Sequence, residues 1–148
     1  RPGRRGMGTT LTAFLYADWI KEGVVGHIGD SRAYRFGPTG VFRLTEDHSW
    51  VAERLKEGVL TRTEAERHPY RNVLTRALGL PEARFDLVEV RLAPGEGVLL
   101  VTDGLYGHVP EEEWRLGRDL QASLEAMVAE ALRRGGDDNV TAVALRVE

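Results

Sequence analysis

The stretch HIGDSRAYRF, residues 27–36, places a charged step between two strand-like segments. Apolar and β-branched residues lead into it at 24–28, and apolar residues alternate with polar ones at 33–36. Between them, Gly29-Asp30-Ser31-Arg32 brings a carboxylate and a guanidinium to one strand junction. A hairpin turn with solvated charges is the simpler interpretation. The other is that Asp30 points into a functional site, and the rest of the chain has to decide between them.

The flanking pattern predicts a sheet-rich domain. Strands are expected at residues 9–17, 24–28, 31–36 and 41–44, and the tight turns between them are typical of an antiparallel meander. Further strands are expected at 73–78, 87–92, 98–102 and 140–147. The order of elements indicates an α+β fold with a mostly antiparallel sheet and helices packed on one face.

Three helices are expected. One short helix follows Ser49, and a second opens at Thr61, where Thr61 and Glu64 have the S/T-x-x-E spacing of a capping box. The clearest helix runs over residues 119–134, where apolar residues repeat at helical spacing and Gly135-Gly136 ends it.

Composition narrows the function classes. A chain of 148 residues is one domain by length, and its net charge of −3 argues against a nucleic-acid partner. The absence of cysteine excludes disulfides, thiolate zinc sites and cysteine nucleophiles. No apolar run approaches the roughly 20 residues that a membrane helix needs. We therefore expect a cytoplasmic protein without a membrane partner.

Aspartates recur where an apolar strand meets a glycine- or asparagine-rich turn. Asp30 follows Gly29, Asp103 precedes Gly104, and Asp137-Asp138 precede Asn139. Each alone is most simply a turn residue. If the strand ends lie at one edge, however, the carboxylates converge and repel, and a cation would stabilise them. Oxygen ligands without His or Cys favour Mg²⁺ or Mn²⁺ over zinc.

Six motifs occur in a characteristic order. Together they resemble the metal-dependent PPM, or PP2C-type, protein serine/threonine phosphatases, and the bacterial branch most closely. The motifs are GMGTTL (6–11), GDSRAY (29–34), LTEDHS (44–49), RNVLTRALG (71–79), LLVTDGL (99–105) and DDNVTAV (137–143).

The resemblance implies a fold and a set of site residues. The fold would be a PP2C-like sandwich of antiparallel β-sheets flanked by helices. Asp103 and Asp138 would be the catalytic acids that ligate the metal on their side of the binuclear Mn²⁺ or Mg²⁺ pair, and Asp30 would bind a third, weaker ion together with Asp103. Asn139 would orient Asp138 without being a ligand, and Arg32 would make a structural ion pair rather than bind phosphate.

The same resemblance implies a reaction. A metal-activated water would hydrolyse phosphoserine and phosphothreonine in a protein substrate, without a phosphoenzyme. The enzyme would thereby oppose a Ser/Thr kinase in signalling. The segment that begins at Trp50 and ends at Tyr70 corresponds to the flap, a variable surface segment beside the active site that influences substrate choice.

Two features keep alternatives open. The family's phosphate-gripping arginine, acidic pair and bridging aspartate have no counterpart before Gly6, so residues 1–148 are expected to be the C-terminal portion of a single domain that lacks its N-terminal strands and helices. A catalytically impaired domain that acts as a binding or regulatory module is therefore the alternative. The GDS triplet also suggests an esterase, but the necessary Asp-x-x-His is absent, and the four histidines are expected to be surface or packing residues.

Overall fold

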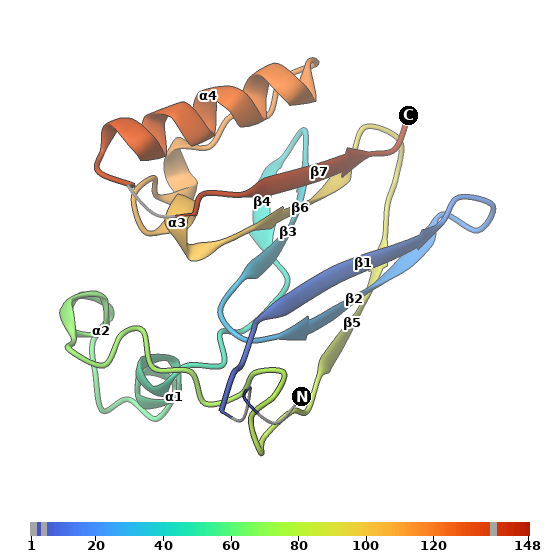
Figure 1. The fold of residues 1–148 in the computed structure, drawn as a ribbon. Helices are drawn as coiled ribbons and strands as arrows, with labels where there is room; N and C mark the ends of the chain where they lie inside the picture. Colours follow the sequence, from blue (N-terminus) through green and yellow to red (C-terminus); the bar gives the residue numbers. More distant parts are fainter. Residues whose placement is uncertain (1–2, 4–5, 137–138) are drawn as a thin grey trace.

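The computed structural model describes residues 3, 6–136 and 139–148, which form two antiparallel sheets and the helices that pack over and beside them (Figure 1). One sheet has the strand order β1-β2-β5 and the other β4-β3-β6-β7. The strands are β1 (Leu11–Ala17), β2 (Glu22–Ile28), β3 (Arg32–Gly37), β4 (Gly40–Arg43), β5 (Asp86–Arg91), β6 (Gly97–Val101) and β7 (Ala142–Arg146). The helices are α1 (Trp50–Lys56), α2 (Arg62–Arg67), α3 (Asp103–Tyr106), the 3₁₀ turn η2 (Glu111–Glu113) and α4 (Leu120–Arg133). The two-sheet architecture confirms the expected fold class.

The chain changes sheets at Gly29-Asp30-Ser31. Strand β2 pairs with β1 and β5, whereas β3 pairs with β4 and β6, so the meander expected for the first four strands is wrong. The alternation of apolar residues locates a strand, but it does not say which neighbour the strand pairs with. Gly29 makes the change possible, because its φ is +109° and a Cβ there would lie 2.5 Å from the Thr10 methyl carbon.

Strand β6 separates two hydrophobic clusters. Val98 packs between the two sheets with Val25, Ala33 and Val90. Leu99 faces the opposite way, into the cluster between the four-stranded sheet and α4. Successive side chains of a strand point to opposite faces, so one strand contributes to both clusters.

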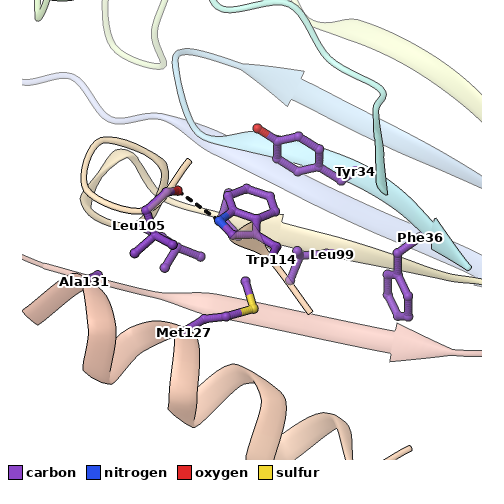
Figure 2. Close-up of a cluster of buried hydrophobic side chains, with 9 residues drawn as sticks. Tyr34, Phe36, Leu99, Leu105, Trp114, Met127 and Ala131 are labelled. Atoms are coloured by element: carbon purple, nitrogen blue, oxygen red, sulfur yellow. Dashed lines mark hydrogen bonds between the residues drawn. The ribbon is translucent and has the colours of Figure 1, made fainter. Parts of the chain in front are cut away.

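Helix α4 covers the outer face of the four-stranded sheet (Figure 2). Its first turn is capped by Asp119, whose Oδ1 accepts a hydrogen bond from the Ala122 amide at 3.0 Å. Met127 and Ala131 are its buried residues. They meet Trp114, whose indole Nε1 donates to the Val109 carbonyl at 2.9 Å. Among the helices that the structure describes, none is long and apolar enough to cross a membrane.

The expected helices are confirmed, and one expected strand is wrong. Thr61 caps α2 as the sequence predicts, α1 follows Ser49 as expected and is capped by it, and α4 spans the expected range. Residues 73–78 do not form a strand and instead contribute isolated bridges at Leu74 and Leu78. Helix α3 was not expected, because a single helical turn leaves no periodicity in a sequence.

Candidate functional site

The segment that carries α1 and α2, residues 50–70, is called the α1–α2 segment. A cleft of about 740 Å³ lies between it and α3. Asp30 and Asp103 both line it, so the structure brings together two of the three predicted site acids. The third, Asp138, lies outside the described residues. The α1–α2 segment contributes Val51, Ala52, Leu55, Arg62, Ala65 and Glu66, and the stretches around β3, β4 and α3 contribute Arg32, Arg43, Asp47, Tyr106, His108 and Glu111.

The turn that carries Asp30 is held by hydrogen bonds on both sides. The Gly29 amide donates to His48 Nδ1 at 3.0 Å, and the His48 amide donates back to the Gly29 carbonyl at 2.8 Å. The Tyr106 hydroxyl donates to the Asp30 carbonyl oxygen at 2.6 Å. The position of Asp30 is therefore set by three contacts to segments distant in sequence.

Two histidines form a buried pair behind this turn. The rings of His27 and His48 lie 4.8 Å apart, and both side chains are buried. Because His48 Nδ1 accepts from Gly29, its proton lies on Nε2, which donates to Asp86 Oδ2 at 2.7 Å. His27 Nε2 donates to the Glu46 carbonyl at 2.8 Å, so its Nδ1 accepts from the Thr12 hydroxyl at 2.9 Å. These two histidines are packing residues, as expected.

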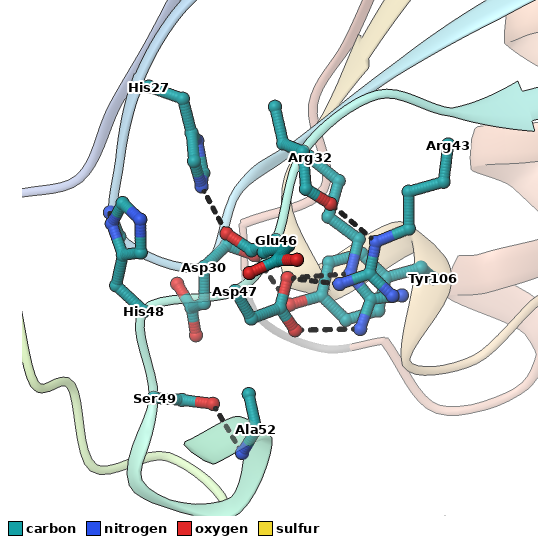
Figure 3. A network of polar contacts seen from close by, with 12 residues as sticks. His27, Asp30, Arg32, Arg43, Glu46, Asp47, His48, Ser49, Ala52 and Tyr106 are labelled. Atoms are coloured by element: carbon teal, nitrogen blue, oxygen red, sulfur yellow. Dashed lines mark hydrogen bonds and ion pairs between the residues drawn. The ribbon is translucent and has the colours of Figure 1, made fainter. Parts of the chain in front are cut away.

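Arg32 makes the structural ion pair that the sequence predicts (Figure 3). Its Nε and Nη2 donate to the two carboxylate oxygens of Asp47 at 2.9 and 2.8 Å, a bidentate geometry. Arg43 Nη2 reaches the same carboxylate at 2.7 Å. The Arg32 guanidinium also stacks on the Tyr106 ring, 3.5 Å from its centroid. Asp47 and Tyr106 therefore belong to the site, although sequence reasoning assigned a role to neither.

Asp103 begins α3 directly after β6 and is exposed to the cleft. The next residue has to be small, because a Cβ on Gly104 would collide with the Asn139 carbonyl oxygen. The Thr102 amide donates to the Thr141 carbonyl at 3.1 Å, and the Thr141 amide donates to the Thr102 hydroxyl at 3.0 Å. The strand end that carries Asp103 thus lies against residues 139–141.

Electrostatics favours a cation near the two acids. Burial, followed by the negative charges of Asp103 and Asp47, raises the pKa of Asp30 to about 6. A divalent cation would offset this repulsion, and carboxylate oxygens are ligands that Mg²⁺ and Mn²⁺ accept. Within the described ranges, no group of three His, Asp or Glu side chains could hold a metal ion, so these residues fit a metal only as part of a ligand set.

The α1–α2 segment forms the other wall of the cleft. Its ends meet in an aromatic cluster in which the Trp50 ring lies 4.8 Å from His68 and 5.5 Å from Tyr70. The segment adds Arg62 to the cleft lining, and Arg71 lines the cleft just beyond it. Sequence reasoning did not single out these arginines, because a lone arginine in a charged surface stretch carries no distinguishing pattern.

Comparison with known proteins places this geometry in a family. No family model matches the chain. The chain is 37% identical over 141 residues to the serine/threonine phosphatase Stp of Listeria welshimeri, covering 92% of this chain and 55% of that protein. It therefore spans about half the length of this relative.

Solved structures agree in fold. The crystal structure of the Mycobacterium tuberculosis serine/threonine phosphatase PstP/Ppp matches with a TM-score of 0.91 and 36% identity, covering 100% of this chain and 63% of that one. A structure of the PstP catalytic domain in complex with two manganese ions matches with a TM-score of 0.86 and 35% identity, again over 100% and 63%. The chain belongs to the PPM, or PP2C-type, family of protein serine/threonine phosphatases, in its bacterial branch.

Proposed function

We propose that residues 1–148 are the C-terminal portion of a single PPM-type domain that hydrolyses phosphoserine and phosphothreonine in proteins. The observation that carries the proposal is the meeting of Asp30 and Asp103 in one cleft of about 740 Å³. The likeness to bacterial phosphatases, over 92% of this chain in sequence and 100% in structure, supports it. That the chain is a portion of such a domain is supported by the coverage, because it matches 63% of the PstP structure.

The cofactors in this proposal are two Mn²⁺ or Mg²⁺ ions, with a third, weaker one. Asp103 and Asp138 would hold the ion of the pair on their side, and Asp30 would hold the third ion with Asp103. When bound, such ions lower the pKa of a water and neutralise the non-bridging phosphate oxygens. The PstP complex with two manganese ions supports manganese in the family.

The chain's own residues would bind and orient the substrate. The cleft walls carry positive side chains, with Arg62 on α2 and Arg71 beyond it, on the side opposite α3. A phosphorylated peptide carries negative charge, so these arginines would attract it into the cleft. The segment from Trp50 to Tyr70 would thereby act as the flap that influences substrate choice. A phosphoprotein is the proposed partner, and a Ser/Thr kinase is the proposed opposing enzyme.

A second candidate is supported by a specific observation. Asp30 and Asp103 line the cleft, but among the described residues no group of three could hold a metal ion. Such a chain would act as a binding or regulatory module that recognises a phosphoprotein without turning it over.

The experiment that separates the two is Mn²⁺-dependent hydrolysis of a phosphothreonine peptide by this chain. We expect phosphate release that depends on Mn²⁺ and that Asp103→Asn abolishes. Asp18→Asn is the matched control, because Asp18 is an exposed aspartate that pairs with Lys21 in the β1–β2 turn, far from the cleft.

The contrary result is also informative. Folded protein that releases no phosphate, but binds the phosphopeptide more tightly than its unphosphorylated form, would replace the enzyme proposal with the binding module. Loss of both properties would contradict each candidate for this chain.

A further inference from the structure

Tyr106 connects the two segments that carry the cleft acids. It is the last residue of α3, and Asp103 is the first, so the two lie three residues apart on one side of a helical turn. Across the cleft wall, the Tyr106 hydroxyl donates to the backbone carbonyl of Asp30 at 2.6 Å. A single side chain thus joins the helix that begins with one acid to the backbone of the other (Figure 3).

The Tyr106 ring is itself held in place. The Arg32 guanidinium lies 3.5 Å from the ring centroid, and its bidentate pairing with Asp47 fixes its plane. The side chains of Arg32 and Asp47 are only 17% and 11% exposed, so water screens this pairing less than it would at the surface. The ring therefore has little freedom to rotate away from Asp30.

We infer that Tyr106 is a positioning residue, which sets the separation of Asp30 and Asp103 through its hydroxyl on the Asp30 backbone and its ring beneath Arg32. The inference rests on the proposed function, because the proposed function gives Asp30 and Asp103 a cation to bind. Two carboxylates without a cation repel each other and would move apart. The Tyr106 hydroxyl and the Arg32 guanidinium stacked on its ring keep them in place beforehand, so less of the binding free energy is spent on ordering them.

The test compares Mn²⁺ binding by the wild-type chain and by Tyr106→Phe, measured by calorimetry with Mn²⁺ alone. The substitution removes the hydroxyl and leaves the ring beneath Arg32. We expect the affinity for Mn²⁺ to fall by about threefold to tenfold, the range that one hydrogen bond contributes. Tyr16→Phe is the matched control: the Tyr16 hydroxyl is buried between the sheets and, among the described residues, has no hydrogen-bond partner. Its removal should leave Mn²⁺ binding unchanged.

A second measurement does not depend on the metal. Hydrogen–deuterium exchange of the backbone should become faster at residues 29–32 in Tyr106→Phe and stay unchanged in Tyr16→Phe. Equal Mn²⁺ affinity together with unchanged exchange would overturn the inference. If the wild-type chain itself binds no Mn²⁺, the metal site of the proposed function fails, and the exchange rates alone decide the role of Tyr106.

Arg32→Lys tests the second half of the inference, the role of the ring beneath Arg32. Lysine keeps the charge but loses both the bidentate pairing with Asp47 and the flat stacking on the Tyr106 ring. We expect Mn²⁺ affinity to fall and exchange at residues 29–32 to rise, in the same direction as in Tyr106→Phe. Wild-type values in Arg32→Lys would show that the hydroxyl acts without the stacked guanidinium and would overturn that half.

Discussion

The two sheets differ in what covers their outer faces. Helix α4 lies along the four-stranded sheet, where Met127 and Ala131 are buried against it. The outer face of the three-stranded sheet instead carries Leu11, Leu15 and Leu87, which are 43%, 73% and 74% exposed. Strand alternation accounts for apolar residues on both faces, because one strand presents side chains to each, and on the outer face these three leucines are left uncovered. The three-stranded sheet is therefore stabilised mainly from its inner side, and its exposed leucines favour association.

The largest effect on stability should come from removing a side chain that is buried between the four-stranded sheet and α4. Trp114→Ala removes a ring that is 2% exposed, packs edge-on against Tyr34 at 4.7 Å and donates a hydrogen bond. We expect the free energy of unfolding to fall by about 3–5 kcal/mol, measured by denaturant titration. Trp19→Ala is the matched control, because Trp19 is 85% exposed in the β1–β2 turn. Similar losses in the two variants would contradict the contrast between the sheets.

A smaller effect on stability should come from protonation of His27, on the inner face of β2. Burial lowers the pKa of His27, outweighing the hydrogen bond to the Glu46 carbonyl, which raises it. The folded chain therefore holds this ring neutral, while the unfolded chain takes up a proton near its ordinary value of 6.5. The stability that neutral His27 provides is present above about pH 6.5 and declines as the pH falls below it.

The measurement is the pH dependence of unfolding in wild type and in His27→Gln, which has no titrating group at this position. The stability advantage of the wild type should shrink between about pH 7.5 and pH 5.5. Parallel curves over that interval would show that His27 is not protonated differently in the two states.

The smallest effect on stability should come from the exposed leucines. Leu87→Ser should change the free energy of unfolding by no more than about 0.5 kcal/mol, while reducing self-association in light scattering. Val90→Ser is the control on the same strand, because Val90 is 5% exposed and faces the inner cluster. A large loss in Leu87→Ser would mean that the outer face is packed in solution.

Sequence patterns predicted the elements better than their pairing. The cap at Thr61 could be predicted, because a cap is a local hydrogen bond over three residues, and the helix after Ser49 could be predicted at its observed start. The pairing of β2 with β5 could not, because it joins residues about 60 positions apart and no local signal encodes it.

The site shows the same division. Asp30 and Asp103 could be proposed from their motifs, and the structure brings them to one cleft. The partners in the contacts that hold them could not, since Tyr106 meets the Asp30 carbonyl across 76 residues, and the ion pair expected of Arg32 is with Asp47, 15 residues away. A tyrosine in a short helix is an ordinary residue until the fold shows which carbonyl it faces.

The α1–α2 segment begins and ends at nearly the same place, because the residues before and after it are hydrogen-bonded to each other. The Trp50 amide donates to the Val73 carbonyl at 2.9 Å, and the Thr75 amide donates to the His48 carbonyl at 3.0 Å. The free energy of closing a loop grows only slowly with its length, so what lies between these two ties can lengthen or shorten at little cost. The segment can therefore be exchanged for another sequence of different length. Grafting another sequence between residues 50 and 73 offers a way to change the shape of the cleft wall while the acids and the sheets stay as they are.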